Sequence, residues 1–289
     1  MNWDFLYKFP ESLQIGSGEA IDIAVKAFSR NHRETLRMIK SVILSSINSV
    51  YYLLEVIPWA LLILIVAYLG WKASKKKYVG LLFAGMLFFI GMAGLWSSML
   101  ETVSMVIVAV FISILLGFPI GILVAMSKRA SAIIRPVLDL MQTMPAFVYL
   151  VPAVILFSPG KTPALIATTI YAIVPMIRMT NLGITHVDGE MVEAGSAFGS
   201  TKLQLLSKIQ VPQAMPSIMA GINQTIMMAM SMVVTCALIG ANGLGMEILL
   251  ATNRVEMGKA LMPGIAIVIL AIILDRLTQG LIEKGVPAE

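Results

Sequence analysis

The sequence predicts an all-α protein that crosses a membrane several times. Of its 289 residues, 58% are hydrophobic and only 13% carry a charge, and the mean hydropathy is +0.88. In a soluble domain roughly a quarter of the residues are charged. The chain also contains several apolar runs long enough for a helix to cross about 30 Å of hydrocarbon. Because a backbone in lipid must satisfy its own hydrogen bonds, we expect a polytopic bundle of helices.

Seven apolar segments qualify as membrane spans, two of them loosely. They cover residues 50–71, 77–98, 102–126, 137–158, 163–184, 212–240 and 261–282. Prolines interrupt the fourth at Pro145 and Pro152 and the fifth at Pro175, which is tolerated where neighbouring helices satisfy the freed backbone groups. We therefore divide the chain into an N-terminal tail (1–49), two peripheral membrane helices (50–98) and a core domain (99–284).

The basic residues of the short loops predict the orientation. The first loop reads KASKKK (72–77) and the third contains Lys128 and Arg135, whereas SSMLE (97–101) between them has no basic residue. Basic loops face the cytoplasm, so residues 185–211 are also expected on the cytoplasmic side, with the N-terminus outside and the C-terminus inside. The net charge of +5 is therefore assigned to loops and not to nucleic-acid binding.

Residues 20–44 mix five basic side chains with regularly spaced apolar ones. This pattern predicts an amphipathic helix lying along a membrane surface. A solvated helical tail packed on the bundle is the alternative. The orientation drawn from the loops would place these five positive charges on the outer side of the membrane. This conflicts with the preference of basic residues for the cytoplasmic side.

The chain has no enzyme signature. Its two histidines, His32 and His186, lie outside the apolar runs, so we expect no histidine metal site or catalytic triad within the membrane. The tripeptide at 160–162 imitates the end of a phosphate loop, but Ile155 stands where that loop needs glycine. We expect neither a metal, a nucleotide nor another cofactor in this chain.

Polar residues inside the sixth span suggest part of a substrate path. Asn223, Gln224 and Met227 could line it, although packing between helices explains them as well. The ionisable residues Glu55, Asp139, Arg178 and Asp275 lie near predicted helix ends, so we expect them to snorkel to the interface. The absence of a run of buried carboxylates weakens, without excluding, a secondary transporter.

The segment 185–212 is mostly polar and has apolar sequence on both sides. Asp188 can cap a first short helix, Gly199 can break it, and Thr201 with Gln204 matches a capping box for a second helix. We expect Leu205, Leu206, Ile209 and the upstream Phe198 near one face, and Pro212 to end this helix and start the next span. Such a projection can insert into a partner's groove, or it can be an ordinary interfacial loop.

This segment resembles the EAA loop of ABC importer permeases, whose pattern is E-A-A, three residues, G, nine residues, then I-x-L-P. The matching residues are Glu193, Ala194, Gly195, Gly199, Ile209, Val211 and Pro212. The chain departs from the pattern with Gly195 for the third alanine and Val211 for leucine. The resemblance implies that these seven residues couple the chain to a partner ATPase.

Residues 136–152, 171–184, 216–234 and 265–279 are similar to permease subunits of glycine betaine, proline and choline importers. The resemblance implies a type I ABC importer permease in the bacterial inner membrane, embedded in lipid and paired with a second copy of itself. It also implies cytoplasmic ATPase subunits that bind ATP and Mg²⁺, and an outer substrate-binding protein.

Selectivity for a quaternary ammonium would come mainly from an aromatic cage in that binding protein. We expect no comparable aromatic cluster in this chain. A stand-alone secondary transporter or channel is the alternative function. The sequence leaves open which osmolyte is carried among glycine betaine, proline betaine, carnitine, choline and proline.

Overall fold

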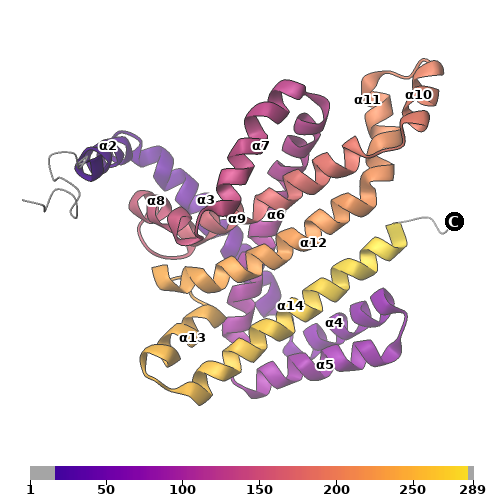
Figure 1. Cartoon of the computed structure of the whole chain (residues 1–289). Coiled ribbons are helices and arrows are strands. Elements are labelled where there is room, and N and C mark those ends of the chain that lie inside the picture. Colours follow the sequence, from indigo (N-terminus) through magenta and orange to yellow (C-terminus); the bar gives the residue numbers. More distant parts are fainter. Residues whose placement is uncertain (1–16, 286–289) are drawn as a thin grey trace, which may run out of the picture.

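The computed structural model describes residues 17–285, and every regular element within them is a helix (Figure 1). In chain order these are α2 (Ser17–Asn31), α3 (Arg33–Val56), α4 (Trp59–Ser74), α5 (Lys77–Met92), α6 (Trp96–Met126), α7 (Lys128–Thr143), α8 (Phe147–Phe157), α9 (Lys161–Thr185), α10 (Gly189–Ala197), α11 (Lys202–Leu205), the π-helix η2 (Leu206–Gln210), α12 (Val211–Thr235), the 3-10 helix η3 (Cys236–Ile239), α13 (Leu244–Asn253) and α14 (Met257–Gly285). The all-α fold class is confirmed. The first 16 residues of the predicted tail lie outside the described residues.

Helix α9 forms the centre of the bundle and packs extensively against α6 on one side and α12 on the other. Small residues permit the contact with α6, since a Cβ atom at Gly121 would lie 2.6 Å from the Cβ of Thr180. A Cβ atom at Gly221 of α12 would likewise lie 2.8 Å from the Cβ of Met179. The G-x-x-x-G pair Gly117 and Gly121 thus permits close approach of α6 to α9.

Two of the predicted spans, 50–71 and 137–158, fall on bent pairs of helices and are not single helices. The chain turns by 97° between α3 and α4, and by 97° between α7 and α8. Both corners occur where a residue precedes a proline: Ile57 before Pro58 and Met144 before Pro145 are extended. The proline ring disfavours helical geometry at the preceding residue, so each apolar run folds as two helices.

Four helical stretches are long and apolar enough to cross a membrane alone among the described residues, and each bent pair can add one more. The four are α6, α9, the continuous stretch Lys202–Ile239, and α14 from Met257 to Gly280. Helix α5 has 16 residues and stops before the end of the predicted span 77–98. It ends at the turn around Gly94, whose φ of +72° favours glycine.

The two ends of the bundle have different chemistry. Lys128 and Thr185 line one groove, so the loop at 127 lies beside the start of the 185–212 segment. Ala73 contacts Gly280, which brings the basic 72–77 turn to the C-terminal part of α14. In Figure 1, α10 and α11 project at the upper right and α13 lies at the lower left. The distribution of basic loops predicts that the end with α10 and α11 faces the cytoplasm.

The N-terminal helices pack across the bundle. Helix α3 contacts α6, α8 and α9, and α2 contacts α8. Lys40 of α3 donates a hydrogen bond of 3.2 Å to the carbonyl of Phe157, the last residue of α8. A lysine in that position satisfies a free carbonyl and complements the negative end of the helix dipole.

The packing at Gly121 leads to a stability prediction. Gly121→Val would press a branched side chain into Thr180 and the Ile177 carbonyl, and overpacking of this kind costs about 1–3 kcal/mol. We expect a lower thermal unfolding midpoint in detergent. Gly264→Val is the matched control, because no atom outside its own helix lies within 4 Å of a Cβ at Gly264 in α14. Equal losses in both variants would contradict the role of close α6–α9 packing.

Candidate functional site

The segment between α9 and α12 folds as the predicted helix–turn–helix projection. The Asp188 carboxylate accepts a hydrogen bond of 2.9 Å from the Glu190 N–H and so caps α10. Gly199 follows α10 with a φ of +78°, which favours glycine. The capping box of the second helix is confirmed: the Gln204 N–H donates to Thr201 Oγ1 (3.3 Å), and the Thr201 N–H donates to Gln204 Oε1 (2.8 Å).

Gly195 is the point at which the two short helices touch. It is buried, and a Cβ atom there would lie 2.5 Å from Ile209 Cδ1 and 2.7 Å from Leu205 Cδ2. This chain thus has glycine in place of the motif's third alanine at the point where Ile209 comes closest to α10. An alanine here would require the tips of Ile209 and Leu205 to shift.

Pro212 does not end the second helix, so that part of the prediction is wrong. The helix runs without a break through 38 residues, from Lys202 to Ile239. The turn before the proline is a π-helix, in which the Val211 N–H donates to the carbonyl of Leu206, five residues back. The wider turn lets the helix accommodate a proline that has no N–H to donate. The projection and the membrane helix α12 are consequently one continuous helical element.

The apolar side chains of the projection point in two directions. Leu206 is buried and packs with Met176, Ile184, Ala214 and Ile218. Phe198 at the end of α10 is 91% exposed, and Leu203 is 72% exposed. The prediction that Phe198 shares a face with Leu206 is therefore wrong, because the turn at Gly199 separates them. Glu193, Ala194 and Pro212 are exposed, whereas Ile209 and Val211 are half-buried.

Asp275 lies in a cluster of hydrogen-bonded side chains between α12 and α14. Its Oδ1 accepts from Asn223 Nδ2 (2.8 Å) and from Gln279 Nε2 (2.9 Å), and its Oδ2 also accepts from Gln279 Nε2 (2.8 Å). The expectation that Asp275 snorkels to the interface is replaced by this inter-helix contact. Gln224 and Met227 are exposed instead, so the structure does not bring the three predicted pathway residues together.

Asp139 and Arg178 form an ion pair between α7 and α9. The sequence predicts each of them as a separate interfacial charge. The sequence does not reveal this pair because the two residues are 39 positions apart. The contact depends on the corner between α7 and α8.

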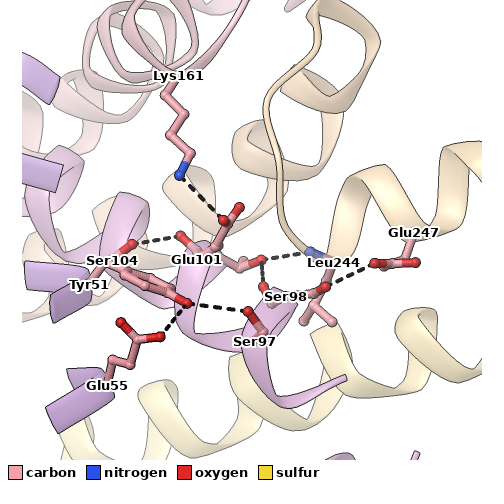
Figure 2. Close-up of polar contacts among 10 residues, drawn as sticks. Tyr51, Glu55, Ser97, Ser98, Glu101, Ser104, Lys161, Leu244 and Glu247 are labelled. Carbon is pink, nitrogen blue, oxygen red and sulfur yellow. Dashed lines mark hydrogen bonds and ion pairs between the residues drawn. The ribbon is translucent and has the colours of Figure 1, made fainter. Parts of the chain in front are cut away.

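A second polar cluster joins α6 to α9 and α13 at the end of the bundle opposite the α10–α11 projection (Figure 2). Glu101 lies 3.4 Å from Lys161, with both side chains about four-fifths buried. Ser98 donates to Glu247 (2.9 Å), and the Leu244 N–H donates to Thr102 Oγ1 (2.9 Å). The lysine of the apparent phosphate loop is thus engaged by a carboxylate. Sequence reasoning missed the cluster because its members are up to 149 residues apart.

The family model for binding-protein-dependent transport system inner membrane components matches residues 114–285. The chain is 46% identical over 233 residues to the glycine betaine/proline betaine permease ProW of Escherichia coli, covering 81% of this chain and 66% of ProW. It is 47% identical over 230 residues to the glycine betaine/carnitine permease GbuB of Listeria monocytogenes, covering 79% of this chain and 82% of GbuB.

The fold is similar to that of a chain in the inward-facing methionine ABC transporter MetNI. The TM-score is 0.60 at 18% identity, covering 64% of this chain and 93% of the solved one. At this identity the similarity concerns the fold alone. The family match over more than half of the sequence, together with these relatives, gives the assignment: the chain belongs to the binding-protein-dependent transport system inner membrane components, as a multi-pass permease subunit of an ABC importer and not an enzyme.

Proposed function

We propose that this permease passes small quaternary-ammonium osmolytes of the glycine betaine and choline type into the cell. The support comes from relatives named for such substrates, including a glycine betaine permease of Bacillus subtilis that is 46% identical over 238 residues. More distant relatives are named for choline and for trimethylamine N-oxide, which also carry a methylated nitrogen. Alkylated nitrogen is therefore the chemistry that these substrates share.

The observation that carries the coupling proposal is the continuous helix from Lys202 to Ile239. Because the second helix of the projection is the start of α12, a displacement of the projection would move a membrane helix directly. Exposed Phe198 and Leu203 offer apolar side chains that a groove on a cytoplasmic ATPase could bury. Closure of that ATPase on ATP would then shift the bundle between inward and outward access.

The residues of the motif have four roles in this proposal. Glu193 and Ala194 are exposed and would contact the ATPase directly, whereas Gly195 and Ile209 hold the two short helices together. Gly199 would set the angle between those helices. Val211 and Pro212 lie at the entry into α12 and would transmit the movement.

ATP and Mg²⁺ would be bound by the partner ATPase and not by this chain. Among the described residues, no group of three or more histidine, cysteine or acidic side chains is placed to hold a metal ion. A second copy of the chain would complete the translocation path, and lipid would cover the remaining apolar helix faces. Gln224 and Met227 would line the path on α12, while Asn223 would fix α14 beside it.

Reconstitution tests whether transport requires the partners. Liposomes that contain this permease, its ATPase and its binding protein are expected to accumulate radiolabelled glycine betaine or choline when ATP is inside. Liposomes with the permease alone should show no uptake above background. Uptake by the permease alone would support the alternative, a secondary transporter or channel, and would refute ATP coupling.

A single substitution tests the coupling turn. Gly199→Val forces a β-branched residue into a φ of +78°, which should distort the angle between α10 and α11. The added Cβ itself meets open space, since no atom beyond the chain neighbours lies within 4 Å of it. We expect normal membrane insertion and roughly tenfold less ATPase in pull-downs, the loss that about 1.4 kcal/mol of binding energy produces. Gly189→Val is the matched control, because Gly189 also has open space but no positive φ. Unchanged pull-down and uptake for Gly199→Val would remove the role of this turn.

Thiol labelling tests the path. Cys236 is the only cysteine of the sequence and is buried, so a Cys236→Ala background allows single cysteines to be introduced. Cysteines at 224 and 227 are expected to react with a membrane-impermeant reagent, and more slowly during substrate uptake. A cysteine at 223 should react least, because Asn223 is half-buried against α14. Labelling of 224 and 227 only by lipid-soluble reagents would place them against lipid and contradict the proposal.

A further inference from the structure

A cavity of about 690 Å³ lies at the outer end of the peripheral helices. It forms where two corners of the chain meet: the Ile57–Pro58 corner between α3 and α4, and the turn around Gly94 between α5 and α6. The basic 72–77 turn is at the other end of α4 and α5. The cavity is therefore on the side of the bundle away from the α10–α11 projection, and its size suits a small ligand.

Four aromatic side chains line this cavity, each from a different helix. They are Tyr51 of α3, Trp59 of α4, Phe88 of α5 and Trp96 of α6. Trp59 and Trp96 are the first residues of their helices, so the two corners bring both indoles to one place. These four rings line one cavity, although no aromatic cluster comparable to that of a binding protein is expected from the sequence. The cluster is invisible in the sequence because its members are spread over 46 positions.

One carboxylate, that of Glu55, also lines the cavity. This carboxylate accepts a long hydrogen bond of 3.3 Å from the Tyr51 hydroxyl. The same hydroxyl also lies 3.3 Å from Ser97 Oγ (Figure 2). Among the described residues Glu55 takes part in no ion pair. The neighbouring cation Lys161 lies 5.9 Å from the centre of the Tyr51 ring and is paired with Glu101. The negative charge of Glu55 is thus available to a ligand.

We propose that this cavity binds an alkylated ammonium group. The faces of aromatic rings attract a cation, most strongly when it is poorly hydrated, and methyl groups on nitrogen pack against apolar walls such as Ile63 and Met92. The carboxylate of Glu55 supplies the counter-charge. An inorganic divalent cation fits poorly, because it needs six or more oxygen ligands and the lining offers few.

Two sources carry this chemistry: a free quaternary-ammonium solute, or the choline headgroup of a lipid from the outer leaflet. The free-solute source rests on the proposed function, whereas the binding chemistry does not. The experiment therefore uses the permease chain alone, without ATPase or binding protein, so that a negative result here leaves the uptake proposal standing.

The test is a titration with tetramethylammonium, followed by saturation-transfer NMR. The permease is held in nanodiscs of phosphatidylglycerol, which has no ammonium headgroup. We expect saturable binding that Glu55→Gln weakens by about tenfold, as the loss of a charge contact worth about 1.4 kcal/mol would. Glu34→Gln is the matched control, an exposed carboxylate at the start of the same helix, and should bind like the parent.

A second pair of variants tests the rings. Trp59→Leu should weaken binding, whereas Trp71→Leu at the far end of α4 should not. Size-exclusion profiles show whether each variant is folded. No saturable binding in phosphatidylglycerol, or equal binding by the Glu55→Gln and Glu34→Gln variants, would overturn the proposal.

Nanodiscs of phosphatidylcholine distinguish the two sources. If the lipid headgroup fills the cavity, tetramethylammonium binding disappears in these nanodiscs, and Glu55→Gln lowers the retention of phosphatidylcholine in native mass spectra. If the cavity serves a free solute, binding is the same in both lipids. Either result supports recognition of an alkylated ammonium.

Discussion

The close contact of α9 with both α6 and α12 is the constraint on which the rest of the molecule depends. Hydrophobic burial does not distinguish one helix from another in lipid, so helices associate there through packing and polar contacts. Gly117 and Gly121 bring α6 onto one face of α9, and Gly183 and Gly221 bring α9 and α12 together on the other. Larger residues would push these axes apart and would separate the side chains that α9 holds at each end.

Both ends of α9 carry contacts that depend on this placement. At the outer end, Lys161 reaches Glu101 at the start of α6. Toward the cytoplasm, Arg178 pairs with Asp139, and the helix leads through Asp188 into the projection. Charges within a membrane bundle are costly unless they are paired, so these contacts require the helices to be correctly positioned. The central helix thus links the outer surface to the segment that would meet the ATPase.

The projection is stiff where a loop would be flexible. A capping box starts its second helix, Gly195 lets α10 pack on that helix, and the π-helical turn before Pro212 carries the helix on into α12. An interruption at this point would absorb a movement before it reached the membrane. A continuous helix would transmit it, and α12 in turn contacts α14 through Asn223 and Asp275.

The sequence by itself determined the membrane class, the helical fold, the caps of the projection and the family, because composition, apolar run length and motif spacing are local properties. It did not reveal the corner before Pro58, the angle of the break that it indicated at Pro145, or the passage through Pro212, since a proline before or within an apolar run can bend, end or continue a helix depending on its neighbours. Only the tertiary structure decided which side chains meet. Tyr51, Glu55, Trp59, Phe88 and Trp96 surround one cavity because the corners bring four helices together, and spacing along a chain carries no record of that geometry.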